Sequence, residues 1–188
     1  MEIELFDLVD EHDTVVGTTN KETAHRDGQI HRAVAVFVFT KDGRLYLQEH
    51  ISDGLLDNSI GGHVKKDESY DEAVKREAKE ELNIICPLAK VDVFYSDERR
   101  QGNTKRHWVT LYECAQPDDW HFQETEEVKK IIPMTFPEII SLVEENPYKF
   151  TGAFINILRK YIKNKNLPYT LKDWHSLHST IHISPNTP

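Results

Sequence analysis

One segment constrains this chain more than any other, residues 61–83, which read GGHVKKDESYDEAVKREAKEELN. It places three glutamates, Glu77, Glu80 and Glu81, within five residues of one another. On a helix, residues three and four positions apart are neighbours, and a like-charged pair at these spacings costs about 0.2–0.5 kcal/mol. Either solvent screens this repulsion, or a positive charge lies between the glutamates.

The helical period decides which of the glutamates face the protein interior. At 100° per residue, Val74, Ala78 and Leu82 form an apolar stripe. Glu77 and Glu81 lie on this stripe or beside it. Buried carboxylates are rare unless they are paired or bound to metal. Because oxygen-rich clusters suit Mg²⁺ or Mn²⁺, the segment predicts a divalent-metal site.

The outer side of the same helix has an ordinary interpretation. It carries Glu72, Lys75 and Lys79, which are typical of a solvated charged face. A pair between Glu72 and Arg76, four residues apart, is expected there. This interpretation explains the outer face but not the two glutamates on the apolar side.

The rest of the chain predicts an α/β fold in which strands and helices are mixed. The helix that carries the glutamates is expected over Asp67–Leu82, with Asp67 or Ser69 as its N-cap. Residues 20–25 are expected to form one short helical turn. The expected strands are Leu5–Val9, Val15–Thr19, Ala33–Phe39, Leu45–Gln48, a short strand within Leu55–His63, Val91–Ser96, Trp108–Cys114 and Val128–Met134. The two remaining helices are expected at Phe136–Glu145 and Thr151–Lys163.

The glutamate segment resembles the Nudix box, Gx5Ex7REUxEExGU, in which U is a bulky apolar residue. The matching residues are Gly62, Glu68, Arg76, Glu77, Glu80 and Glu81. Ala78 is small for a U position, and Asn83 replaces the final glycine. Asn is the next most tolerant residue of the left-handed conformation that follows such a helix, so neither change removes a catalytic group.

This resemblance implies an α/β/α sandwich with a central mixed β-sheet. It also implies an enzyme that hydrolyses a diphosphate linked to another moiety, with Mg²⁺ or Mn²⁺ as cofactor. By the same resemblance, Glu77, Glu80 and Glu81 bind metal, and Arg76 orients Glu77. The implied further contributors are Glu68 as a direct or water-mediated ligand, Gly61 through its backbone carbonyl, and Glu127 as an additional ligand or base.

A second resemblance covers about residues 4–162. The order DLVDEHDTVVG, QIHRAVAVFVF, DGRLYLQEH, NSIGGHV and EEV is similar to isopentenyl-diphosphate isomerase. His25, His31, His63 and Glu127 fall near the metal ligands of that enzyme. The isomerase, however, has a catalytic Cys before its Gly-His, where this chain has Gly61. Because proton transfer at carbon needs an acid/base partner, an isomerase-like frame with hydrolase chemistry is expected.

Three groups of residues keep open alternatives at this stage. The alternative for Glu127 is a solvated loop acid. His31 and His63 are interpreted as structural residues or substrate contacts in preference to metal ligands, and His25 as a solvated residue or local cap. The basic loop 99–106 is interpreted as a solvated hairpin tip, with phosphate contact or a dimer contact as the alternatives.

Composition limits the partners and the setting. The net charge of −9 argues against a protein that coats a nucleic acid polymer, and an anionic substrate would have to be received at a local positive site. No run of about 18 apolar residues predicts a membrane span. Two cysteines, without a CxxC, favour a cytoplasmic setting.

The expected organisation is one domain over residues 1–165 and a polar C-terminal extension over 166–188. A homodimer is one oligomeric state that the sequence allows. The leading functional hypothesis is hydrolysis of a small-molecule diphosphate, such as a nucleoside diphosphate derivative. The alternatives are an isomerase of the isopentenyl-diphosphate type and a non-catalytic ligand-sensing module.

Overall fold

The computed structural model describes residues 4–100 and 103–171, which form nine strands, four α-helices and one short 3₁₀ helix. The strands are β1 (Leu5–Val9), β2 (Val15–Asn20), β3 (Ile30–Phe39), β4 (Leu45–His50), β5 (Leu56–Asp57), β6 (Ile60–His63), β7 (Ala89–Arg100), β8 (Asn103–Ala115) and β9 (Val128–Met134). The helices are α1 (Lys21–Asp27), α2 (Tyr70–Leu82), α3 (Phe136–Glu145), η1 (Pro147–Lys149) and α4 (Gly152–Asn164).

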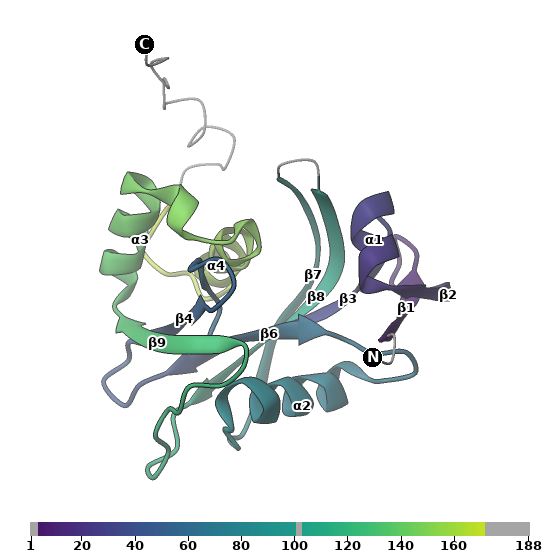
Figure 1. Ribbon diagram of the computed structural model, residues 1–188. Coiled ribbons are helices and arrows are strands. Elements are labelled where there is room, and N and C mark those ends of the chain that lie inside the picture. The colour runs from purple at the N-terminus through teal and green to yellow at the C-terminus, as the bar shows by residue number, and fades with distance from the viewer. Residues whose placement is uncertain (1–3, 101–102, 172–188) are drawn as a thin grey trace, which may run out of the picture.

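The sheet is built around β3, which pairs with four other strands. Strand β8 runs parallel to it, from Ile30↔Arg106 to Phe39↔Ala115, whereas β1, β4 and β6 run antiparallel. Helix α2 covers one side of this mixed sheet, and α3 and α4 cover the other (Figure 1). The predicted α/β/α sandwich with a central mixed sheet is therefore confirmed.

Alternate residues of β3 serve two separate hydrophobic clusters. Val34, Val36 and Val38 pack with α2, whereas Ala35 and Phe37 pack with α3 and α4. A strand that is covered on both sides must be apolar at every position. This is why AVAVFVF appears in the sequence as a continuous apolar run without alternation.

Helix α2 begins at Tyr70, three residues later than the predicted Asp67, because Asp67 adopts a left-handed backbone (φ 63°) in the preceding turn. Ser69 is the N-cap, and its side chain forms a reciprocal capping box with Glu72. The Glu72 carboxylate is therefore engaged at the cap, and the expected pair with Arg76 is wrong. At the other end, Asn83 has φ 48°, the left-handed conformation predicted for it.

Several other boundaries differ from the expectation. Helix α1 extends over Lys21–Asp27, longer than one turn, with Asn20 as its N-cap. Strand β7 extends to Arg100 and strand β8 begins at Asn103, so most of the predicted basic loop is strand. Helix α3 and strand β9 have the predicted bounds.

The last described residues of the chain, up to 171, pack against the core. Leu171 is buried, and Leu167 and Tyr169 pack against the cluster beneath α3 and α4. Part of the predicted extension therefore belongs to the core, whereas 172–188 lie outside the described residues. Among the described residues, no helix is long and apolar enough to cross a membrane.

Candidate functional site

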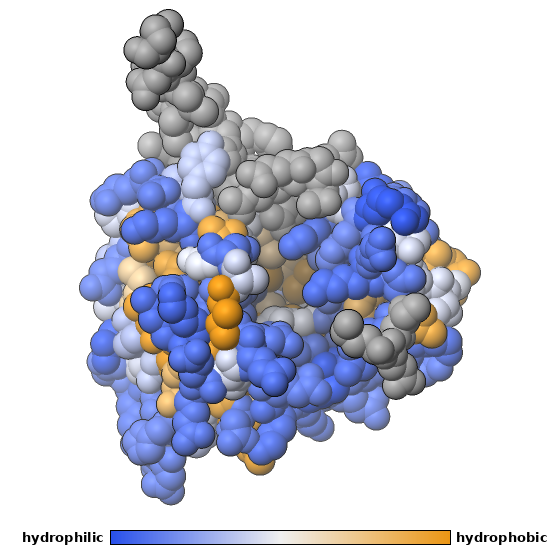
Figure 2. Space-filling view, in the orientation of Figure 1, coloured by the Kyte–Doolittle hydropathy of each residue, from blue (hydrophilic) through white to orange (hydrophobic). Residues whose placement is uncertain are grey.

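Six glutamates line one cavity of about 520 Å³ between α2, β6 and the segment that precedes β9. Glu77, Glu80 and Glu81 come from α2, Glu126 and Glu127 from the later segment, and Glu4 from the residue before β1. The face of the molecule in Figure 2 is mostly hydrophilic and is hollowed near its centre. Carboxylates on α2 and before β9, at least 45 positions apart in sequence, thus line a single space, because β9 pairs with β4, which also pairs with β5.

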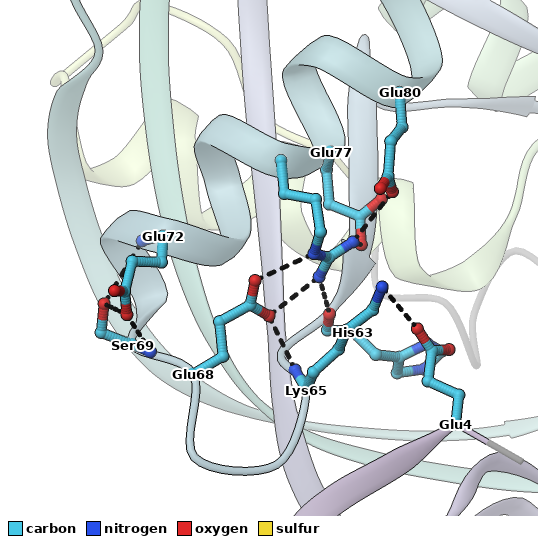
Figure 3. A network of polar contacts seen from close by, with 9 residues as sticks. Glu4, His63, Lys65, Glu68, Ser69, Glu72, Glu77 and Glu80 are labelled. Carbon is cyan, nitrogen blue, oxygen red and sulfur yellow. Dashed lines mark hydrogen bonds and ion pairs between the residues drawn. The ribbon is translucent and has the colours of Figure 1, made fainter.

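Arg76 links three glutamates, Glu68, Glu77 and Glu80. Figure 3 labels these three glutamates and draws the hydrogen bonds that their carboxylates accept. Its Nη1 donates to Glu77 Oε1 at 2.7 Å and to Glu80 Oε2 at 3.0 Å. Its Nη2 donates to the carbonyl oxygen of His63 at 2.9 Å. The predicted ion pair with Glu77 is present, and the same guanidinium also ties α2 to the end of β6.

The carboxylate of Glu68 forms its hydrogen bonds outside the cavity. Its two oxygens accept hydrogen bonds from Arg76 Nε and Nη2, each at 2.9 Å, and one also accepts from the Lys65 amide at 2.8 Å. Burial acts to raise the pKa of Glu68, but these hydrogen bonds outweigh it, and the pKa is lowered overall. Glu68 thus holds Arg76 in place, and its predicted role as a metal ligand stays a prediction.

Glu77 and Glu81 are buried, as the helical period predicts, with 8% and 4% of their surface exposed. Burial raises the pKa of Glu77 to about 7 and the pKa of Glu81 well above its ordinary value. Glu81 Oε2 accepts a hydrogen bond from the Gly61 amide at 3.0 Å. Within the described parts of the chain, no cationic side chain forms an ion pair with Glu81.

Gly62 is required by a close approach between β6 and α2. A Cβ atom at this position would lie 2.1 Å from the carboxyl carbon and Oε1 of Glu77. A Cβ at the neighbouring Gly61 would meet no atom nearer than 3.8 Å. The first glycine of the motif therefore makes room for the Glu77 carboxylate, a role that does not depend on unusual backbone angles.

Glu127 enters the site through the loop before β9. Its charge acts to raise the pKa values of Glu77 and Glu81, with which it shares the cavity. Its backbone oxygen accepts from the Ile51 amide at 3.4 Å. Across the described ranges, no cation is paired with Glu127.

These groups fit a divalent cation. Glu81 and Glu127 lack a cationic partner in the described structure, and burial penalises the charge of Glu81. Donors that are all oxygen suit Mg²⁺ and Mn²⁺. Glu77, Glu80, Glu81, Glu127 and the backbone of Gly61 all line the cavity and could hold such an ion. The assignment of each as a ligand stays a prediction.

A second group of potential ligands consists of histidines, one of which sequence reasoning missed. One side-chain nitrogen from each of four residues lies within 4.8 Å of the others: His25, His31, His63 and His107. Burial lowers the pKa of His25 to about 4 and lowers the other three pKa values as well. The expectation that His25 is solvated is wrong, because α1 packs against β8 and places its Nε2 among the other rings.

The cavity also holds a histidine that the sequence did not single out. His50 Nε2 lies 3.4 Å from Asp57 Oδ2, and this hydrogen bond raises the pKa of His50. The basic segment 99–106 contributes less to the site than His50 does. Its Arg106 pairs with Asp97 at 3.2 Å, and residues 101–102 lie outside the described structure.

Comparisons with known proteins agree with this geometry. A model of the NUDIX domain matches residues 29–154. The chain is 30% identical to the uncharacterized Nudix hydrolase YfcD of Escherichia coli (strain K12), over 85% of this chain and 87% of that protein. It is 40% identical to isopentenyl-diphosphate Delta-isomerase 2 of Photorhabdus laumondii, but over 48% of this chain and only 54% of the isomerase.

Among solved structures, the crystal structure of DR0079 from Deinococcus radiodurans is similar, with a TM-score of 0.70. That similarity covers 84% of this chain and 98% of the other at 23% identity. At this identity the likeness concerns the fold.

Proposed function

The chain belongs to the Nudix family, and from that premise we propose that it is a divalent-metal-dependent hydrolase of a diphosphate linkage. The proposed substrates are nucleoside diphosphate derivatives or similar small molecules, and Mg²⁺ is the preferred cofactor, with Mn²⁺ as a substitute. One observation carries the proposal: Glu77, Glu80, Glu81 and Glu127 all line one cavity, and the charge of Glu127 acts on both Glu77 and Glu81.

In the proposed reaction, a water oxygen bonds to one phosphorus, the bridging P–O bond breaks, and the water proton passes to a carboxylate. A bound divalent cation would offset the charge of the phosphates and make the water more acidic. Glu77 and Glu81 hold their carboxyl groups at the wall of the cavity, where a carboxylate that does not hold the cation would receive the proton. Arg76 positions Glu77 and Glu80 on that wall.

A relative that is named as an isomerase favours the isomerase alternative, but the residues that line the cavity do not. Gly61 lies where the isomerase resemblance requires a cysteine, and its amide is engaged with Glu81. Neither cysteine of the chain lines the cavity, because Cys86 and Cys114 lie in the hydrophobic cluster beneath α2. Allylic proton transfer therefore lacks the thiol that the resemblance calls for.

A substrate panel tests the proposal. Release of phosphate or pyrophosphate would be measured with Mg²⁺ on nucleoside di- and triphosphates, nucleotide sugars, dinucleotides and isopentenyl diphosphate. We expect turnover on at least one diphosphate and none in the Glu80→Gln/Glu81→Gln variant. Turnover that persists in the variant would overturn the carboxylate site. Isomerisation of isopentenyl diphosphate without hydrolysis would favour the isomerase, and ligand binding without turnover would favour the sensing module.

Metal binding should also change how stability depends on pH. Because the pKa of Glu77 is raised to about 7, the metal-free folded state binds more protons than the unfolded state between about pH 4.5 and 7. Stability of the metal-free protein should therefore decrease as the pH rises through this window. Bound Mg²⁺ should reverse the trend, because it stabilises the ionised carboxylates and binds only the folded state.

The measurement is a thermal melt at pH 5 and pH 8, with and without millimolar Mg²⁺. At 100-fold excess over its dissociation constant, a ligand stabilises by about 2.7 kcal/mol, which is about 5–10 °C for a chain of this size. We expect that increase at pH 8 and a much smaller one at pH 5. An equal effect at both pH values would show that these carboxylates do not bind the ion.

A further inference from the structure

The two cysteines of the chain lie in one hydrophobic cluster, although they are 28 positions apart in sequence. Cys114 lies near the end of β8 and is buried, with 6% of its surface exposed. Cys86 lies between α2 and β7 and is half-buried. Both side chains pack in the cluster that α2 forms with β3 and β8, and both are free thiols.

The pairing of β7 with β8 explains why the two residues meet. The ladder between these strands begins at Ala89 and Glu113, so the segment just before β7 continues toward Cys114. Cys86 and Leu88 of this segment pack in the cluster, whereas the residue after each of them is exposed. In an extended chain every second side chain points to the same face. The segment therefore presents Cys86 to the side of β8 on which Cys114 lies.

The two thiols contact each other directly, because they share a side-chain hydrogen bond. In a disulfide the sulfur atoms are about 2.05 Å apart, so formation of the bond requires a further approach. Cys114 is held in the sheet by the pairing of β8 with β3. Residues 83–88, which include Cys86, belong to no helix or strand, so the approach falls to Cys86.

The environments of the two thiols are unequal. The hydrogen bond from Cys114 lowers the pKa of Cys86, although burial acts in the opposite direction. The same hydrogen bond raises the pKa of Cys114, and burial raises it further. Because the thiolate is the reactive form, Cys86 is the nucleophile of the pair, and its partial exposure admits a small oxidant. Cysteines that respond to oxidants combine these properties with a neighbouring second cysteine.

We propose that Cys86 and Cys114 form an oxidation site that reacts with a hydroperoxide and closes into an intrachain disulfide. In the first step the Cys86 sulfur bonds to one peroxide oxygen, the O–O bond breaks, and the other oxygen leaves with a proton as water or an alcohol. Cys86 is then a sulfenic acid. In the second step the Cys114 sulfur bonds to the Cys86 sulfur, the S–O bond breaks, and the hydroxyl leaves as water with the proton of Cys114. The two thiols lose two electrons together, and the peroxide gains them.

The disulfide would fasten the C-terminal end of α2 to the sheet. Asn83 ends the helix three residues before Cys86, and Ile84 between them is buried in the same cluster. Glu81 lies in the last turn of the helix, so the bond would restrain the segment that follows this carboxylate. The oxidation stands without the proposed function, because in the described structure neither cysteine lines the glutamate cavity.

The first experiment measures the bond itself. The reduced full chain is treated with a small excess of hydrogen peroxide and unfolded, its remaining thiols are alkylated, and its mass and its disulfide-linked peptides are determined. We expect the wild type to lose two hydrogens, to take up no alkylating reagent and to yield one peptide pair that joins Cys86 to Cys114. Dithiothreitol should reverse the change.

Two variants separate the roles of the thiols. In Cys114→Ser the reaction should stop at the sulfenic acid of Cys86, which dimedone captures, whereas the wild type should take up little dimedone. In Cys86→Ser the thiol of Cys114 should stay reduced. Circular dichroism checks the fold of each variant, and the peptide map of the wild type tests the bond even where the buried Cys114→Ser does not fold. Two thiols that stay free in the treated wild type, or a disulfide between two chains in place of the intrachain bond, would overturn the site.

The second experiment compares the melting temperatures of the oxidised and the reduced wild type. A disulfide that closes a loop of about 30 residues in a chain of this size should raise the melting temperature by about 5–15 °C. Cys86→Ser, which changes a half-buried position, is the matched control for peroxide damage at other residues and should show no increase. An unchanged or lower melting temperature of the disulfide form would contradict the fastening of α2 to the sheet.

Discussion

Replacing Glu81 with Gln is expected to reduce Mg²⁺-dependent hydrolysis by more than about 100-fold while leaving the fold intact. Changes beside a metal site, at residues that only support the ligands, already cost about 10–100-fold, and loss of a ligand carboxylate should exceed this. Gln has the same shape and can still accept the hydrogen bond from the Gly61 amide. The measurement is steady-state hydrolysis of the substrate that the panel identifies.

Stability should respond to the same substitution in the opposite sense. Burial raises the pKa of Glu81 well above its ordinary value, so its charge destabilises the metal-free fold at neutral pH. Glu81→Gln removes that charge, and its melting temperature without metal should equal or exceed that of the wild type at pH 8. The increase on addition of Mg²⁺ should be smaller than in the wild type. Retained hydrolysis in a folded Glu81→Gln protein would contradict the role assigned to this carboxylate.

Replacing Gly62 with Ala is expected to have the second large effect. The added Cβ would lie 2.1 Å from the Glu77 carboxyl group, so either the side chain or β6 must shift. Overpacking of this kind typically costs about 1–3 kcal/mol of stability. Because Glu77 would leave its position beside Arg76, we expect hydrolysis to decrease by about 100-fold, as judged from the usual sensitivity of catalysis to a displacement of about 1 Å.

Gly61→Ala provides a matched control for this prediction. Its Cβ would meet no atom nearer than 3.8 Å, which is ordinary van der Waals contact, and the backbone groups of residue 61 would be preserved. Activity and melting temperature should stay close to those of the wild type. If both variants lose activity equally, the contact between Gly62 and Glu77 is not what requires glycine in this motif.

The features of α2 that follow from local spacing could be predicted. The positions of Val74 and Ala78 determine which side of the helix is buried, and Glu77 and Glu81 follow them at fixed angles. The left-handed Asn83 is a property of a single residue type at the end of a helix. These features depend on interactions within about one turn, so no knowledge of the rest of the fold is needed.

The hydrogen-bond partners of Arg76 could not be read from helical spacing alone. A charge pair with Glu72 satisfies the i,i+4 rule, but Ser69 engages Glu72 at the N-cap. Arg76 instead binds Glu68 from the preceding loop and the His63 carbonyl from β6. Only the return of β6 alongside α2 brings that carbonyl oxygen within reach.

The sequence by itself determined the glutamate helix, the apolar character of β3 and the class of fold, because each depends on a local period or on a motif with fixed gaps. The resemblance implied a role for Glu127, and the tertiary structure places this residue in the cavity. The tertiary structure alone decided that His107 completes the histidine cluster. His31 and His107 are 76 residues apart, and the parallel pairing of β3 with β8 places them 3.1 Å from each other. Strand pairing across such a separation depends on the packing of the whole sheet, which leaves no periodic signal around either histidine.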